Sequence, residues 1–227
     1  MTEPDLAKLT IGVLGGTGPQ GKGLALRWAV AGLRVVIGSR DAGRAATAAA
    51  ELVEQGGLAA DAVTGADNPG CAAEADVVLV AVPWDGHDSL LSSLRSELAG
   101  KIVIDCVNPM GFDKQGPFAL PVQEGSAAEQ AAALLPDSRV TAAFHHVSAV
   151  TLVDLSVTDM NLDVMVLGDD REATDQVRAL ADAIPGVRGV FAGRLRNAGQ
   201  VEALTANLIA INRRYKTHAG IRVTDLP

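Results

Sequence analysis

Aromatic and basic residues are scarce in this 227-residue sequence, and both shortages exclude classes of protein. Aromatic residues make up only 3% of the chain, so broad stacking platforms for nucleic-acid bases are not expected. The chain has 19 Lys and Arg against 27 Asp and Glu, and its net charge of −8 argues against a nucleic-acid surface, which needs a basic face. Any basic cluster in so acidic a chain is therefore expected to be placed for an anion.

Cysteines and long hydrophobic runs are scarce too. Cys71 and Cys106 have no metal-ligand spacing, so they predict two free thiols in a reducing compartment and no metal site. The polar N-terminus lacks the apolar core of a signal peptide, and no stretch approaches the ~18 apolar residues of a membrane span. We expect a cytoplasmic protein that binds neither membrane nor nucleic acid.

Short apolar segments alternate with helical patterns along the first 144 residues. Strands are predicted at 10–14, 34–38, 63–64, 76–82, 101–106 and 139–144, and helices at 19–31, 42–55 and 88–98. Residues 67–74 read as a short connection and 108–125 as a Gly/Pro-rich loop, before a helix that Ser126 and Glu129 open as a capping box. Since parallel strands need crossover helices, the pattern predicts an α/β Rossmann fold with a doubly wound parallel sheet.

The remainder of the chain predicts a small C-terminal α/β domain. Strands are expected at 163–168 and 187–191, and helices at 171–183 and 198–216, the last with apolar residues at the helical period. We therefore expect an NADP-binding domain over 1–144 and a second domain over 145–227, packed together with a ligand cleft between them.

A glycine-rich segment links the first predicted strand to the first helix. Gly16-Thr17-Gly18-Pro19-Gln20-Gly21 fits the dinucleotide fingerprint G-x-G-x-x-G, in the strand-to-helix context that supports it. Gly16 is expected to allow the tight turn, Gly18 to let the backbone approach a pyrophosphate, and Gly21 to let the helix pack closely. Pro19 loses no helical hydrogen bond in the first turn, and the free N–H groups there face the phosphates.

The end of the second predicted strand indicates which dinucleotide binds. NAD-specific folds place an Asp or Glu there, whereas this chain has Gly38-Ser39-Arg40, followed by Arg44. Ser39 can donate to the 2′-phosphate of NADP, Arg40 can clamp it, and Arg44 is within reach one turn along the helix. The alternative is a solvated loop with ordinary surface arginines. The acidic background favours NADP(H).

Two more strand ends belong beside the point where nicotinamide normally lies. Val82 and Pro83 follow the fourth predicted strand and Asn108 follows the fifth, although ordinary strand endings are the alternative. The Tyr–Lys pair of short-chain reductases is absent, because the only tyrosine, Tyr215, has no lysine four residues later. No acid/base pair for a carbonyl substrate is recognisable.

These segments also carry a family resemblance. The segment from Ile11 to Arg27 resembles NADPH-dependent coenzyme F420 reductases (F420:NADP oxidoreductases). The same is true of Gly38-Ser39-Arg40, Ala81-Val82-Pro83, Ala143-Phe144-His145-His146, Val201–Thr205 and, near the end, Gly220–Val223. The resemblance implies an oxidoreductase that transfers hydride directly and reversibly between NADP(H) and the deazaflavin coenzyme F420, which requires mainly stacked proximity and exclusion of water.

The resemblance also assigns residues. It implies that Thr17, Ser39, Arg40 and Arg44 hold the 2′-phosphate and that Pro83 and the loop after the fifth strand bracket the nicotinamide. It places His145 near the deazaflavin ring as the catalytic-site histidine, with a histidine hydrogen-bonded at a strand end as the alternative. Cations for the phosphate and glutamate tail of coenzyme F420 are to be sought among Arg194, Arg196, Arg213, Arg214, Lys216 and His218. A homodimer is a further family expectation, which the long final helix supports.

Two other functions stay open from the sequence. One is an NADPH-dependent reductase of related fold that acts on a flavin, ferric or imine acceptor. The other is a non-catalytic NADPH sensor. A sensor needs no second cleft, whereas the Gly/Pro-rich loop with Phe112 and Phe118 indicates that one exists.

Overall fold

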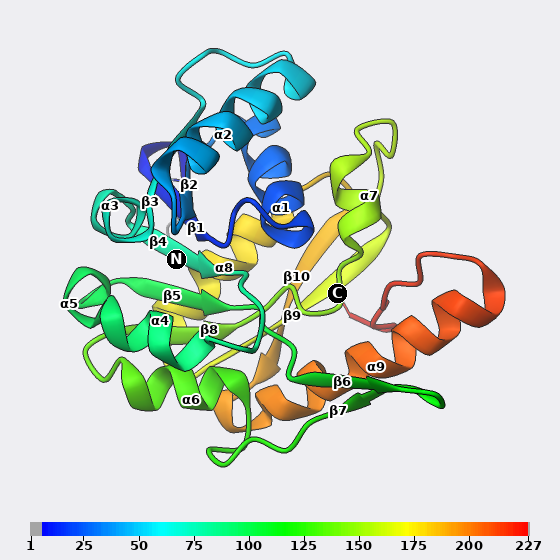
Figure 1. Cartoon of the computed structure of the whole chain (residues 1–227). Coiled ribbons are helices and arrows are strands. Elements are labelled where there is room, and N and C mark those ends of the chain that lie inside the picture. Colours follow the sequence, from blue (N-terminus) through cyan, green and yellow to red (C-terminus); the bar gives the residue numbers. More distant parts are fainter. Residues whose placement is uncertain (1–5, 227) are drawn as a thin grey trace.

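Six strands of the first part of the chain run parallel, as the sequence predicts. The computed structural model describes residues 6–226 (Figure 1). The strands are β1 (Thr10–Leu14), β2 (Arg34–Ser39), β3 (Val63–Asp67), β4 (Val77–Val80), β5 (Ile102–Asp105) and β8 (Arg139–Ala142). They pair in parallel in the order β3-β2-β1-β4-β5-β8. This is the strand order of a Rossmann sheet, so the predicted fold class is confirmed.

Helices cover both faces of this sheet. The helices are α1 (Pro19–Val30), α2 (Ala42–Gly56), α3 (Asn68–Glu74), α4 (His87–Ser93), α5 (Arg95–Leu98), α6 (Ala127–Leu134), α7 (Ala149–Val153), α8 (Arg171–Asp182) and α9 (Ala198–Tyr215). One core lies under α1, α2, α7 and α8, around Trp28 and Leu180. The other lies under α3 to α6 and the start of α9, around Leu91 and Leu135. Because both faces are covered, β1, β4 and β5 are buried along their whole length.

The second part of the chain extends the same sheet. Strands β9 (Leu162–Gly168) and β10 (Val187–Gly193) run parallel to each other, with α8 between them in the chain. β9 joins the edge of β8 in the antiparallel direction, which completes a sheet of eight strands. The division of the chain into two domains at residue 144 stays a prediction.

Two helical segments differ from the sequence prediction. The prediction of a short connection over residues 67–74 is wrong, because residues Asn68–Glu74 form α3. Asp67 caps this helix by accepting a hydrogen bond from the Gly70 N–H at 2.8 Å. The single helix expected over 88–98 is two short helices, α4 and α5, which are separated at Leu94.

The loop expected over 108–125 contains a β-hairpin. Strands β6 (Met110–Asp113) and β7 (Gly116–Ala119) pair in antiparallel register and form a separate two-stranded sheet beside α9 (Figure 1). In the turn, Asp113 accepts hydrogen bonds from the N–H groups of Gln115 and Gly116 at 2.7 and 3.1 Å. Gly116 adopts a φ of +125°, which favours glycine.

A buried arginine joins α1 to α7, a helix that the sequence analysis does not predict. Arg27 is only 3% exposed, and its guanidinium donates to four backbone carbonyls. The acceptors are the carbonyls of Leu152 and Thr151 at 2.8 Å, Val157 at 2.9 Å and Asp154 at 2.6 Å. Burial lowers the pKa of Arg27, and the charge of Asp154 opposes this shift. Arg27 therefore holds the end of α7 and the following turn against α1.

The C-terminal tail after α9 is held against the sheet. The Oδ1 of Asn212 accepts from the Ala219 N–H at 2.7 Å. The buried Asp163 of β9 accepts from the Val223 N–H at 2.6 Å and from two guanidinium nitrogens of Arg188 at 3.0 and 2.9 Å. Within the described part of the chain, no helix has the length and apolar character needed to cross a membrane.

Candidate functional site

In the glycine-rich turn between β1 and α1, two of the fingerprint glycines have no room for a Cβ atom. A Cβ on Gly21 would lie 2.7 Å from the Gly15 carbonyl oxygen, and one on Gly16 would lie 2.6 Å from Cγ2 of Ile37. The left-handed residue of the turn is Gly15, with a φ of +77°, so the turn role that we expected for Gly16 belongs to Gly15. Gly16 is instead needed for close packing against β2.

The start of α1 suits an anion. Its N-cap residue is Gly18 and its first residue is Pro19, and no side chain within the described residues caps the helix. The first N–H groups of the helix are therefore left without a capping acceptor, which is the arrangement that binds phosphates in dinucleotide folds.

The end of β2 lies beside a pocket lined by charged side chains of both signs. Thr17, Lys22, Arg44 and Thr47 line this pocket together with the acidic Asp41 and Glu51. Asp41 accepts from the Arg44 N–H at 2.8 Å as the N-cap of α2, and Lys22 pairs with Glu51 at 2.6 Å. Thr17 and Arg44 are thus brought together as predicted, and Lys22, one turn into α1, is an addition that the fingerprint alone does not identify.

The other two residues predicted for this region lie next to the pocket. Ser39 ends β2 and is buried, and its Oγ accepts from the Asp41 N–H at 3.3 Å. Arg40 follows it with an exposed side chain.

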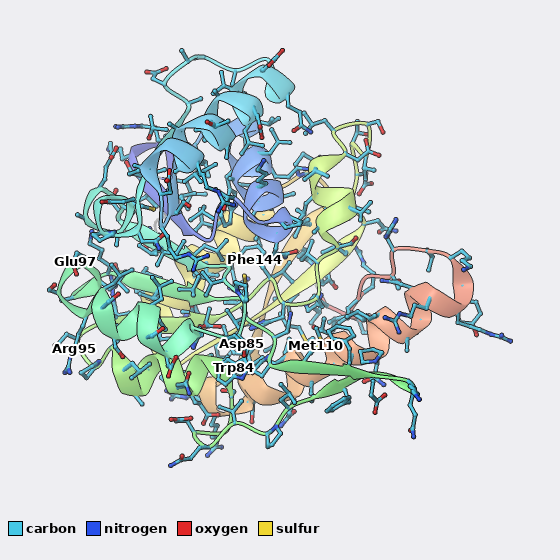
Figure 2. All side chains as sticks on the ribbon, viewed as in Figure 1. Trp84, Asp85, Arg95, Glu97, Met110 and Phe144 are labelled. Carbon is cyan, nitrogen blue, oxygen red and sulfur yellow. The ribbon has the colours of Figure 1, made fainter. Side chains whose placement is uncertain are left out.

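The main cleft opens at the carboxyl ends of β4, β5 and β8 and has a volume of about 400 Å³. It is lined by the segments after these strands, by one face of α9, by Gln20 and by Ala219. Of the residues predicted from the sequence, it brings together Gln20, Val82, Pro83, Asn108 and His145. Trp84, Met110 and Leu208 also line it, although the sequence alone gives them no role. In Figure 2, Trp84 and Met110 lie in the lower half of the view, near the start of the hairpin.

Hydrogen bonds fix the backbone that carries His145. Phe144 adopts a left-handed φ of +67°, and its buried ring packs edge-on against Trp28 with centroids 5.5 Å apart. Gln20 donates to the Phe144 carbonyl at 3.1 Å. The Asn108 amide and the Thr205 hydroxyl reach the His145 carbonyl at 3.0 and 3.2 Å. Gln20 and Asn108, predicted as cofactor-binding residues, therefore also tether this turn.

The His145 ring is buried without partners. It is 3% exposed, and neither ring nitrogen has a hydrogen-bond partner among the described residues. Burial lowers the pKa of His145 to about 4, helped by neighbouring His146 and opposed by the charge of Asp105. His145 is therefore neutral at neutral pH, with one N–H donor and one acceptor nitrogen left for a ligand.

His146 lies beside it in the same lining. Its Nε2 accepts from the Met165 N–H at 3.4 Å, so this histidine is tied to β9. Burial also lowers the pKa of His146 to about 4.

The candidate cations for an anionic tail stand apart from this cleft. Of the six, all described by the structure, none lines the cleft. Arg194 pairs with Asp169 at 3.5 Å. His218 contacts the cleft wall, since its Nδ1 lies 3.4 Å from Oγ of Ser148.

Comparisons with known proteins identify relatives of this chain. A family model described as "NADP oxidoreductase coenzyme F420-dependent" matches residues 10–109. The F420-dependent NADP reductase of Methanothermobacter thermautotrophicus is 43% identical over 224 residues, which covers 96% of each chain. That of Methanocaldococcus jannaschii is 39% identical and covers 96% of this chain and 99% of its own. A solved structure from Arthrobacter sp., provisionally described as an F420-dependent NADP reductase, superposes with a TM-score of 0.81 at 25% identity, covering 95% of this chain and 99% of its own.

Proposed function

Since this chain belongs to the family of coenzyme F420-dependent NADP oxidoreductases, we propose that it transfers hydride reversibly between NADP(H) and the deazaflavin coenzyme F420. The observation that carries the proposal is similarity along nearly the full chain to reductases named for these two coenzymes. The nicotinamide and deazaflavin rings supply the hydride chemistry when they are bound. The chain's own residues bind the coenzymes, orient them and exclude water.

The glycine-rich turn and the end of β2 form the proposed NADP(H) site. Gly18 leaves the backbone open to a pyrophosphate, Gly16 and Gly21 allow the close packing of the turn, and Thr17, Pro19 and Gln20 complete the turn at the uncapped start of α1. Ser39, Arg40 and Arg44 are proposed to hold the 2′-phosphate, with Thr17 on the same pocket. This assignment is supported by Asp41, whose carboxylate is engaged as a helix cap.

The main cleft forms the proposed reaction site. Val82, Pro83 and Asn108 follow β4 and β5, where a Rossmann sheet presents nicotinamide. His145 is proposed to position the deazaflavin ring through its unpartnered nitrogens. Because the imidazole is neutral and direct hydride transfer needs no protein acid or base at the reacting carbon, His145 acts as a binding group that transfers no proton.

A spectroscopic assay tests the function. Purified protein mixed with NADPH and oxidised coenzyme F420 is expected to bleach the visible absorbance of the deazaflavin, with NADH much slower. Deuterium from stereospecifically labelled NADPH is expected on the reduced deazaflavin, because direct transfer leaves no exchangeable intermediate. Faster reduction of riboflavin or FMN than of coenzyme F420, or loss of the label to water, would contradict the proposal.

A homodimer is part of the proposal. Phe112 and Phe118 of the hairpin are 60% and 44% exposed, and Ile211 and Tyr215 on α9 are 39% and 72% exposed. The hairpin packs beside α9, so these side chains belong to one region that a second copy is proposed to cover. Sedimentation of wild-type protein is expected to give a dimer, and the double variant Phe112→Lys/Tyr215→Lys a monomer.

A cytoplasmic location completes the proposal. It is supported by Cys71 and Cys106, which are both buried free thiols. Burial raises the pKa of the Cys71 thiol to about 12, so the thiol stays protonated and unreactive. Cell fractionation tests the location.

A further inference from the structure

A cluster of buried polar side chains lies behind the cleft wall, outside the coenzyme contacts proposed above. We call His87, Asp105, Gln130 and Glu202 the polar cluster. His87 and Asp105 are fully buried and Glu202 is 4% exposed. They come from α4, β5, α6 and α9, so the cluster joins four elements that are distant in the sequence. Burying charges is costly, and apolar residues would fill such a space more cheaply. The cluster therefore calls for an explanation beyond packing.

Hydrogen-bond geometry makes His87 a cation. Its Nε2 lies 2.7 Å from Oδ2 of Asp105 and its Nδ1 lies 3.0 Å from Oε1 of Gln130. The amide of Gln130 is oriented by its NH₂ group, which donates to Glu124 at 3.3 Å. Both ring nitrogens thus face oxygen acceptors, which only a doubly protonated imidazolium satisfies. Burial opposes this charge, but the hydrogen bond and charge of Asp105 outweigh it and raise the pKa of His87.

Two walls of the cleft rest on the His87–Asp105 pair. The second carboxylate oxygen of Asp105 accepts from the Val107 N–H at 3.0 Å and so fixes the loop after β5. Asn108, the next residue of that loop, holds the His145 carbonyl. On the other side of the pair, the Trp84 ring packs on the His87 ring with centroids 5.4 Å apart, a distance at which a cation is attracted to an aromatic face.

Glu202 connects a third wall. Its carboxylate accepts from the Ala127 and Ala128 N–H groups at 2.9 and 3.2 Å, at the start of α6. One turn further along α9, Thr205 reaches Asn108 and the His145 carbonyl. Burial and, to a smaller extent, the nearby charge of Asp105 raise the pKa of Glu202 to about 7, and the α6 N–H groups and His87 oppose this shift.

We propose that His87, Asp105 and Glu202 are positioning residues for hydride transfer, which hold Trp84, the loop after β5 and the Thr205 face of α9 in register around the two coenzymes. This inference rests on the proposed function. The three side chains act through these walls, without touching the reacting atoms. Since misplacement of reacting groups by about 1 Å can cost about a hundredfold in rate, a small relaxation of the walls is enough to slow the reaction.

The test compares Asp105→Asn and Glu202→Gln with Val177→Ala. Both cluster substitutions preserve side-chain shape and remove one charge, whereas Val177 is buried on α8 and does not line the cleft. Single-turnover hydride transfer is expected to slow about tenfold to a hundredfold in the two cluster variants, while the Kd for NADPH changes less than about threefold. Val177→Ala, a loss of packing away from the cleft, is expected to leave both quantities unchanged.

A second measurement reports on the cluster without turnover. The chain has four histidines, so long-range ¹H–¹⁵N spectra can resolve each ring. At pH 7, His87 is expected to give the imidazolium pattern and His145 and His146 the neutral pattern, and Asp105→Asn is expected to make His87 neutral. We expect the wild-type rate to depend on pH near neutrality and the rate of Glu202→Gln to lack this dependence.

The outcomes separate the two claims. Absence of wild-type turnover with coenzyme F420 overturns the proposed function and this inference with it. With wild-type turnover established, unchanged rates in both folded cluster variants overturn the positioning role alone. Equal losses of rate in the cluster variants and in Val177→Ala would mean that the cluster only stabilises the fold, which also overturns the positioning role.

Discussion

Replacing Arg27 with methionine tests how firmly α7 is held against α1. The substitution keeps the length and the apolar stem of the side chain and removes all four hydrogen bonds to the carbonyls of residues 151, 152, 154 and 157. We expect the protein to fold but to unfold at a lower temperature, because the carbonyls of residues 151, 152 and 157 lose their guanidinium donor, while that of Asp154 keeps the Val157 N–H at 3.1 Å.

The size of the loss in unfolding free energy depends on how exposed the four acceptor carbonyls are to water. A hydrogen bond from a charged donor contributes roughly 1.5–3 kcal/mol, and a buried unsatisfied carbonyl costs roughly 1–3 kcal/mol. Only the bond to Leu152 is fully buried, so water replaces part of the other three. The unfolding free energy is therefore expected to fall by about 3–5 kcal/mol, which is less than the sum over four fully buried hydrogen bonds. For a chain of this size, each kcal/mol lowers Tm by roughly 2–4 °C, which gives a decrease of about 10 °C.

Thermal and urea unfolding followed by circular dichroism measure the effect. Lys22→Met on the same helix is the matched control, since its ion pair with Glu51 is exposed and contributes less than about 1 kcal/mol. Arg27→Lys is expected to fall between the two, because one ammonium group cannot reach all four carbonyls. If Arg27→Met and Lys22→Met lowered Tm equally, the four hydrogen bonds would have no net stabilising effect and the reasoning would be refuted.

Three further predictions concern binding, catalysis and pH. Arg40→Ala should weaken NADPH binding about tenfold or more and leave NADH binding nearly unchanged, and equal losses in titrations would contradict its 2′-phosphate role. His145→Ala should raise KM for coenzyme F420 and lower kcat moderately, whereas a loss of about 10²–10⁴ in kcat with an altered pH profile would make it an acid or base. Folded Glu202, with its pKa raised from 4.5 to about 7, keeps a proton that the unfolded chain loses, so its contribution to stability falls as pH rises from about 4.5 to 7. Urea unfolding should show Glu202→Gln gaining about 3 kcal/mol relative to the wild type over that range, and a constant difference would count against the shift.

Local sequence predicts the parallel sheet and the dinucleotide turn well, because each depends on neighbouring residues. The apolar run over 76–82, for example, contains the buried strand β4. The helix at Asn68–Glu74 is missed because its Asn-Pro-Gly start is equally typical of a turn, and its cap by Asp67 decides the outcome. The hairpin is missed because its strands have four residues each, contain Gly and Pro, and depend on packing beside α9.

Local sequence does not predict the polar cluster. Asp105 ends an apolar strand, and its partner His87 lies 18 residues earlier in the chain. Glu202 meets Ala127 across 75 residues, so only the folded chain brings these groups together. The family resemblance of Ala143-Phe144-His145-His146, by contrast, indicates His145, whose burial and unpartnered nitrogens follow from the turn at Phe144.

The anchored tail has a practical consequence for handling the protein. Ala219 forms part of the cleft wall, and Val223, close behind it, is fastened to Asp163 at the sheet edge. Val223 thus anchors the segment that carries Ala219, and the chain around residue 223 is a poor place to cut or to attach a rigid fusion. A truncation before Val223 should loosen the cleft at Ala219, whereas a flexible tag after residue 227 leaves the anchor in place.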